Sequence, residues 1–273
     1  MTEIDQALRE HHLELSTNRP GPSFRELAEL PLVVLVGLTA VGKTSAVERV
    51  LASCDLHLLP NRRWIADLLV IPAMLRKVGQ AVVTVDDRVR RFELTARYRS
   101  LYEGGIAHAL GLLSIDTSRV SPPFLFDGLR GIDEVRWAWE HLPNTRFVAL
   151  DAPDLIRLNR LLLRDERFDG TAIPDRWASK ASPLEEALGR LPGVDAVFSR
   201  DDIRRIASAT AEAPGELETV LQKAAIILEE RRNYDSRRAA DFLERQLPQE
   251  RWLRVDTAEL DIGSVARLIL DWL

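Results

Sequence analysis

The sequence lacks long hydrophobic runs and has a single cysteine, Cys54. One thiol excludes an internal disulfide and any metal site built from several cysteines, and it is typical of a reducing compartment. Apolar stretches such as residues 31–36 are far shorter than a membrane span. The N-terminal segment is charged throughout and lacks the apolar core of a signal peptide. We therefore expect a soluble, cytoplasmic protein with no membrane partner.

The sequence also lacks an excess of positive charge. It has 37 Lys and Arg residues against 42 Asp and Glu residues, a formal net charge of -5. This balance argues against nucleic acid or an anionic membrane as the main partner, although a local basic patch is permitted. With 273 residues, 46% of them hydrophobic, the chain can bury a sizeable core in one large α/β domain or two small ones.

Strand-like and helix-like segments alternate along the chain. Strands are predicted at 32–36, 56–60, 122–128, 146–153 and 251–257, and the main helices at 42–53, 91–113, 153–167, 217–228, 239–247 and 265–272. Such alternation implies a parallel sheet with right-handed crossovers. The first and last strand–helix units lie at the two ends of the sequence. This favours an α/β fold with one doubly wound core and inserts over two independent domains.

The segment before the first strand reads as helical. Ile4 and Leu8 share one face of a short helix, and Ser23 with Glu26 resembles a capping box that opens another. The predicted organisation is a helical extension at 1–30 and a core at 31–273, with inserts at about 61–113 and about 165–247.

Residues 37–44, "GLTAVGKT", match the phosphate-loop pattern G-x-x-x-x-G-K-[ST]. The match follows an apolar strand and opens a helix, which is the context that the pattern needs. Its glycines let the backbone wrap closely around a ligand, and successive N–H groups at a helix N-terminus form an anion cradle. We predict that the loop binds ATP through Gly37, Thr39, Ala40, Val41, Gly42, Lys43, Thr44 and Ser45.

Two residues of this loop and one distant aspartate have predicted chemical roles. Lys43 would reach the β- and γ-phosphates, and the Thr44 hydroxyl would bind Mg²⁺. Asp127 ends the strand-like segment "FLFDG", where open α/β sheets bind ligands, and it is the candidate carboxylate on the Mg²⁺ side. Asp151, in "VALDAP", is the rival, with a strand-end turn or a helix cap as its other role.

A possible acceptor site follows the second predicted strand. Arg62 and Arg63 could take the anionic group of an acceptor, and Asp67 could accept a hydroxyl proton. The same residues could equally form a surface turn and the charges of a helix. An acceptor site and a charged surface turn therefore remain two open alternatives for these residues.

Four arginines share one predicted helix: Arg157, Arg160, Arg164 and Arg167. Their spacing of three or four residues allows all four to face one side. They could stabilise charge on a transferring phosphoryl group, with Arg164 and Arg167 nearest the loop that follows. The alternative is a solvated basic helix face.

Three segments resemble the P-loop kinases of the nucleoside-monophosphate-kinase and small-molecule-kinase type. "GLTAVGKTS" is similar to their phosphate loop, and "FLFDGLRG" resembles a stretch of adenylate kinases, with Asp127, Gly128 and Arg130 on matching positions. "VALDAPDLIRLNRLLLRDERFDG" resembles the strand and the arginine-bearing helix that lead into their lid, where arginines such as Arg164 and Arg167 close over the phosphates. The resemblance implies a P-loop NTPase fold with a five-stranded sheet in the order 2-3-1-4-5.

The resemblance also implies transfer of the γ-phosphoryl group of Mg-ATP to a small-molecule or nucleotide acceptor, with Arg130 near the substrate. The insert at about 165–247 is longer than a simple lid, and no acceptor motif follows the second strand. A P-loop regulatory ATPase that acts on a protein partner therefore remains an alternative. A tRNA prenyltransferase is a third, but the Asp-Ser-rich motif expected there is missing. The helical insert could form a homodimer contact or bind a protein partner.

Overall fold

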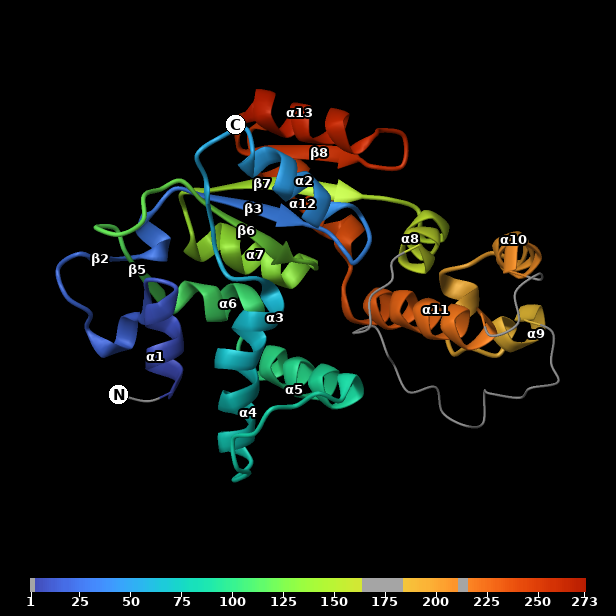
Figure 1. Cartoon of the computed structure of the whole chain (residues 1–273), viewed down its shortest axis with the longest axis horizontal. Coiled ribbons are helices and arrows are strands. Elements are labelled where there is room, and N and C mark those ends of the chain that lie inside the picture. Colours follow the sequence, from blue (N-terminus) through green and yellow to red (C-terminus); the bar gives the residue numbers. More distant parts are fainter. Residues whose placement is uncertain (1–2, 164–183, 211–215) are drawn as a thin grey trace. The chain divides into compact units, whose positions relative to one another are not determined.

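The computed structural model describes residues 3–163, 184–210 and 216–273 (Figure 1). The chain divides into two compact units. The first, called here the sheet unit, comprises Met1–Gly37, Gly42–Asp151 and Asp235–Leu273. The second, the helical unit, comprises Leu38–Val41 and Ala152–Tyr234.

A five-stranded parallel sheet forms the centre of the sheet unit. Its strands are β3 (Leu32–Val36), β4 (His57–Leu58), β6 (Phe124–Leu129), β7 (Thr145–Asp151) and β8 (Trp252–Asp256). They lie side by side as β4-β6-β3-β7-β8. Numbered along the chain, this is the order 2-3-1-4-5, so the predicted fold class is confirmed. Every residue of the central strand β3 is buried, which explains its continuous apolar sequence.

Helices cover both faces of this sheet. α2 (Lys43–Leu51) packs against α13 (Ile262–Trp272), and α7 (Ile132–His141) packs against α12 (Ser236–Gln246). Figure 1 shows α13 and α7 on opposite sides of the strands. The predicted doubly wound arrangement is therefore confirmed. None of the described helices has the length and apolar character needed to cross a bilayer.

The segment before β3 is only partly helical. α1 (Glu3–Glu10) agrees with the predicted helix, but β1 (Leu13–Leu15) and β2 (Phe24–Glu26) are strands. Both pair antiparallel with β5 (Leu113–Asp116). The short 3-10 turn η1 (Ser16–Asn18) follows β1, and η2 (Leu27–Glu29) follows β2. The prediction of a helix that opens at Ser23 is wrong. The carbonyl of Ser23 instead accepts a hydrogen bond from the Thr117 amide, a partner far away in sequence.

Residues 62–111 form a series of helices: α3 (Arg62–Ile65), the π-helical η3 (Ala66–Val70), α4 (Ile71–Lys77), α5 (Arg88–Leu101) and α6 (Ile106–Gly111). The single helix predicted at 91–113 is thus two, with a break at Gly104 and Gly105. Both glycines have positive φ, +83° and +50°. A Cβ at Gly104 would lie 2.2 Å from Cγ of Trp137 on α7, so only glycine lets the chain pass this close.

The helical unit consists of α8 (Asp154–Leu162), α9 (Leu184–Gly189), η5 (Val194–Ala196), α10 (Arg200–Thr210) and α11 (Glu216–Asn233). Its apolar core includes Leu158, Leu188, Phe198 and Ile227, together with Ala40. The insert expected up to residue 247 stops earlier, at Tyr234. α12 contacts α7 and β7 and belongs to the sheet unit, because its apolar face covers the sheet.

Replacement of Gly104 by alanine tests the break between α5 and α6. The matched control is Gly79→Ala, because Gly79 also has positive φ (+70°) but a Cβ there would meet no atom within 4 Å. The backbone cost of a left-handed alanine is about 1–2 kcal/mol. Overpacking against Trp137 should add about 1–3 kcal/mol in Gly104→Ala alone. Chemical denaturation measures both free energies of unfolding, and equal losses would contradict the packing.

Candidate functional site

The phosphate-loop motif connects the end of β3 to the start of α2. Its first residue is fixed to the neighbouring strand, because the Gly37 amide donates to the Leu129 carbonyl of β6 at 2.9 Å. Ala40 (φ +64°) and Gly42 (φ +93°) adopt left-handed backbone conformations. Such residues within a turn aim successive N–H groups toward one side. The loop therefore has the backbone form of an anion cradle, at the carboxyl end of a central parallel strand.

The N-terminus of α2 adds a second source of positive potential. Its N-cap is Gly42, which has no side chain that could cap the helix end. The first-turn N–H groups of a helix lack intrahelical partners and carry the positive end of the helix dipole. Thr44 and Ser45 in this turn are exposed. A helix end of this kind binds phosphate groups in proteins, so the residues present fit the phosphates of a nucleotide.

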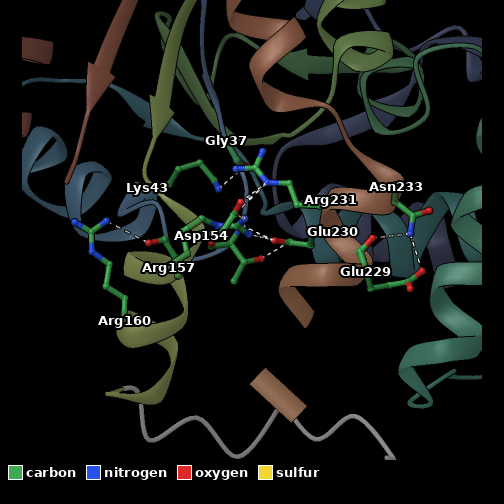
Figure 2. A network of polar contacts seen from close by, with 11 residues as sticks. Gly37, Lys43, Asp154, Arg157, Arg160, Glu229, Glu230, Arg231 and Asn233 are labelled. Carbon is green, nitrogen blue, oxygen red and sulfur yellow. Dashed lines mark hydrogen bonds and ion pairs between the residues drawn. The ribbon is translucent and has the colours of Figure 1, made fainter. Parts of the chain in front are cut away.

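The side chain of Lys43 reaches the first residue of the same loop. Its ammonium donates a 2.7 Å hydrogen bond to the carbonyl oxygen of Gly37 (Figure 2). The side chain is half-buried, which limits the positions that the ammonium can take. The positive charge is thus held near the loop that the sequence identified.

Asp127 lies at a β-bulge near the end of β6. Val34 of β3 is opposite Phe126, whereas Val36 is opposite Leu129, so Asp127 and Gly128 together face Leu35. Bulges of this kind bend a strand and re-aim its side chains, and they are common beside active sites. The Asp127 side chain is half-buried. It lies on β6, the strand next to β3, and its role as the Mg²⁺-side carboxylate stays a prediction. Asp151 ends β7, on the opposite side of β3.

Arg62 is held by the segment that follows Asp127. Its guanidinium forms a bidentate pair with Glu134, at 2.7 and 2.8 Å, and donates to the Gly128 carbonyl at 2.8 Å. Glu134 is almost fully buried and also accepts from the Arg130 amide at 2.9 Å. The pair therefore orders the chain after the bulge. The role of Arg62 and Arg130 in substrate binding stays a prediction.

Asp67 and Arg63 lie one helical turn apart and form a long ion pair of 3.7 Å. Asp67 also pairs with Arg91 of α5, a partner that the sequence pattern did not suggest. Arg63 and Asp67 are both exposed. The structure thus brings these two predicted acceptor-site residues together and adds a second cation. The general-base role of Asp67 stays a prediction.

The arginines of α8 are not a solvated helix face. Arg157 is fully buried, and it donates to Asp154 (2.5 Å), to Glu230 (2.5 Å) and to the Thr39 carbonyl (2.8 Å). Burial lowers the pKa of Arg157, while the carboxylates of Glu230 and Asp154 oppose that shift. Arg160 donates to the Ala40 carbonyl at 3.3 Å. Arg164 and Arg167 lie outside the described residues.

Sequence reasoning missed Glu230. Its carboxylate accepts hydrogen bonds from the Thr39 amide (3.0 Å) and the Thr39 hydroxyl (2.5 Å). One signal was available. Glu230 follows Ile226 and Ile227 by four and three residues, so it continues the apolar face of α11. A carboxylate on a buried face requires a partner, but the pattern does not reveal which partner.

The strand order and the position of the loop after β3 are those of the α/β P-loop NTPase fold. No family model matches the chain, and no curated protein matches it.

Solved structures with distant similarity include a sugar kinase from Janibacter sp. HTCC2649, with 15% identity over 89% of this chain and 94% of that chain and a TM-score of 0.37. A shikimate kinase from Bacteroides thetaiotaomicron has 12% identity over 88% and 97%, with a TM-score of 0.36. A sulfotransferase from Alicyclobacillus acidocaldarius has 12% identity over 89% and 80%, also with a TM-score of 0.36.

Truncation of Glu134 tests the structural role of its pair with Arg62. Glu134→Ala leaves the half-buried guanidinium of Arg62 without its carboxylate partner and should lower the free energy of unfolding by up to about 3–5 kcal/mol. The control is Glu29→Ala, because Glu29 pairs with Arg25 at 2.8 Å but both side chains are about half exposed. Its loss should be below about 1 kcal/mol. Urea denaturation compares the two, and similar losses would contradict the assigned role of Glu134.

Proposed function

We propose that the protein is an ATP-dependent phosphotransferase that moves the γ-phosphoryl group of Mg-ATP to a small-molecule or nucleotide acceptor. The observation that supports this most directly is the loop at residues 37–44. It combines left-handed turns, a helix N-terminus and Lys43 at the carboxyl end of a parallel sheet. In the reaction, the bond from the γ-phosphorus to the β-phosphate oxygen breaks, and a bond to an acceptor oxygen forms. The proton of the acceptor hydroxyl passes to a carboxylate of the protein.

The loop would hold the triphosphate in position. The main-chain N–H groups of Gly42, Lys43 and Thr44 would donate to phosphate oxygens, assisted by the dipole of α2, whereas the Thr39 amide is bound to Glu230. Lys43 would exchange its bond to the Gly37 carbonyl for the β- and γ-phosphates. Catalysis of phosphoryl transfer depends on such positioning and charge rather than on covalent participation of the protein.

Thr44 and Asp127 are the residues that would hold Mg²⁺. Their hydroxyl and carboxylate oxygens are of the type that this ion prefers. When bound, Mg²⁺ neutralises charge on the phosphate oxygens. The bulge at Asp127 and Gly128 would set the direction of the carboxylate, and the pair of Arg62 with Glu134 would keep the following chain in place.

The acceptor would bind to the exposed pair of Arg63 and Asp67. Arg63 is suited to an anionic group and Asp67 to a hydroxyl proton, so a hydroxylated, anionic acceptor is the class proposed. Arg130, Arg164 and Arg167 would contribute further positive charge around the transferred group. Arg62 is proposed as a second cation for the acceptor's anionic group, with its guanidinium held by Glu134 and the Gly128 carbonyl.

A regulatory ATPase is the second candidate, and one observation favours it. Side chains of α8 and α11 bind Thr39 and Ala40 in the middle of the loop. Nucleotide occupancy could thereby alter the helical unit and its affinity for a protein partner. Hydrolysis of ATP without any acceptor, together with tight ADP binding, would favour this candidate. ADP formation that requires a metabolite pool would favour the phosphotransferase.

Lys43→Ala tests the role of the loop. Loss of the ammonium should lower the rate of ADP formation by about 10²–10³-fold, the effect of one charge-stabilising group. The control is Lys77→Ala on α4, whose ammonium lies 5.7 Å from the ring centroid of Tyr102. It should retain the wild-type rate. A steady-state assay of purified protein with Mg-ATP and a metabolite pool measures both rates. Unchanged turnover in Lys43→Ala would overturn the proposed function.

Asp127→Asn and Asp151→Asn compare the two rival carboxylates. The first should lower kcat by about 10²-fold and raise the Mg²⁺ concentration needed for half-maximal rate, because a ligand charge is lost. The second should leave the Mg²⁺ dependence unchanged. Initial rates over a Mg²⁺ titration give both values. The reverse result would move the metal site to the end of β7.

A further inference from the structure

We propose that Glu230 is a positioning residue for the phosphate-binding loop, acting through Thr39 without contact to the reacting atoms. The inference rests on the proposed function, because it assumes that the loop binds a nucleotide. It adds a residue of α11, almost two hundred positions from the motif, to the determinants of nucleotide affinity.

The first observation is the double contact between one carboxylate and one loop residue. Oε2 of Glu230 accepts from the Thr39 amide at 3.0 Å, and Oε1 accepts from the Thr39 hydroxyl at 2.5 Å. Hydrogen bonds to an ionised acceptor are shorter and stronger than neutral ones. Together the two bonds fix both the peptide plane and the side chain of Thr39.

The second observation is that Arg157 fixes the other side of the same residue. Its Nη2 donates to Glu230 at 2.5 Å (Figure 2). Its Nε donates to the Thr39 carbonyl at 2.8 Å. The ion pair therefore occupies both the donor and the acceptor of the Thr39 backbone. Arg160 also donates a hydrogen bond to the loop, at the carbonyl oxygen of Ala40.

The third observation explains why the loop needs this support. Ala40, the next residue, has φ +64°, a conformation that costs an L-residue about 1–2 kcal/mol. Such conformations persist where the surrounding structure determines them, and they occur at ligand sites. Ala40 is also packed in the apolar core of the helical unit. The bonds to Thr39 thus hold the turn whose geometry aims the N–H groups that follow.

Burial of the charges agrees with a positioning role. Glu230 and Arg157 are both fully buried. Well-packed apolar side chains often stabilise a fold as well as a buried ion pair does, so stability alone is a weak reason for a pair at this place. Asp154 offers a contrast within the same network. Its hydrogen bonds are to Arg157 and Arg231, and none of those described reaches a loop atom.

Binding of a fluorescent, non-hydrolysable ATP analogue with Mg²⁺ to the full-length chain tests the inference. Glu230→Ala should weaken the analogue's Kd about tenfold or more, as expected for loss of hydrogen bonds to a charged group. Glu230→Gln should restore part of the affinity, because its amide oxygen can still accept from the Thr39 amide. Thr39→Ala removes the hydroxyl bond alone and should weaken binding less than Glu230→Ala does.

A double-mutant cycle shows whether the two residues act through their contact. Thr39→Ala should have little further effect in the Glu230→Ala background, because the bond that it removes is already lost. Should Glu230→Ala fail to fold, the same cycle is run with Glu230→Gln. The matched control is Asp154→Asn, which removes a carboxylate from Arg157 and should lower Tm while leaving Kd within about twofold.

The outcomes separate this inference from the proposed function. If Lys43→Ala abolishes binding but Glu230→Ala does not weaken it, Glu230 is not a positioning residue and the proposed function stands. If Asp154→Asn weakens binding as much as Glu230→Ala, general loss of stability explains the effect and the inference fails. If the wild-type chain does not bind the analogue, the proposed function fails and this inference fails with it.

Discussion

The account depends on one constraint, the turn of the backbone between β3 and α2. A parallel sheet brings the ends of its strands to one edge, and the turn there passes directly into the N-terminus of a helix whose N-cap is a glycine. Left-handed residues at Ala40 and Gly42 give that turn its shape. Peptide N–H groups and the Lys43 ammonium then supply positive potential where a neutral loop would supply little. Every chemical role proposed for Thr44 and Asp127 assumes phosphates held at this place.

Much of the sheet unit could be predicted because its signals are local. Each of three signals occupies only a few consecutive residues: the apolar run of β3, the loop motif after it and the strand that ends in Asp127. The order of the strands followed from the resemblance to P-loop kinases. The antiparallel sheet could not be predicted in this way. β1 and β2 pair with β5, almost a hundred residues away, and strands of three residues carry little pattern of their own. The position of α12 likewise depends on which apolar face covers β7.

The residues of the candidate site also differ in whether local sequence signals could predict them. Loop residues were identified from spacing, whereas the partners of charged side chains depend on burial in the folded chain. Arg62 is predicted to bind an acceptor, and its ion pair with Glu134, far along the chain, has no signal in the sequence. The arginines of α8 could be read as a solvated face, yet Arg157 is fully buried against Glu230. Sequence patterns identify the charged residues, and only the fold determines which of them remain available to a ligand.

The most direct test of the central claim is a crystal structure of the full chain with Mg²⁺ and a non-hydrolysable ATP analogue. The account predicts phosphate oxygens within hydrogen-bond distance of the main-chain amides of Gly42, Lys43 and Thr44, and of the Lys43 ammonium. A nucleotide bound elsewhere, with these amides facing solvent, would contradict it.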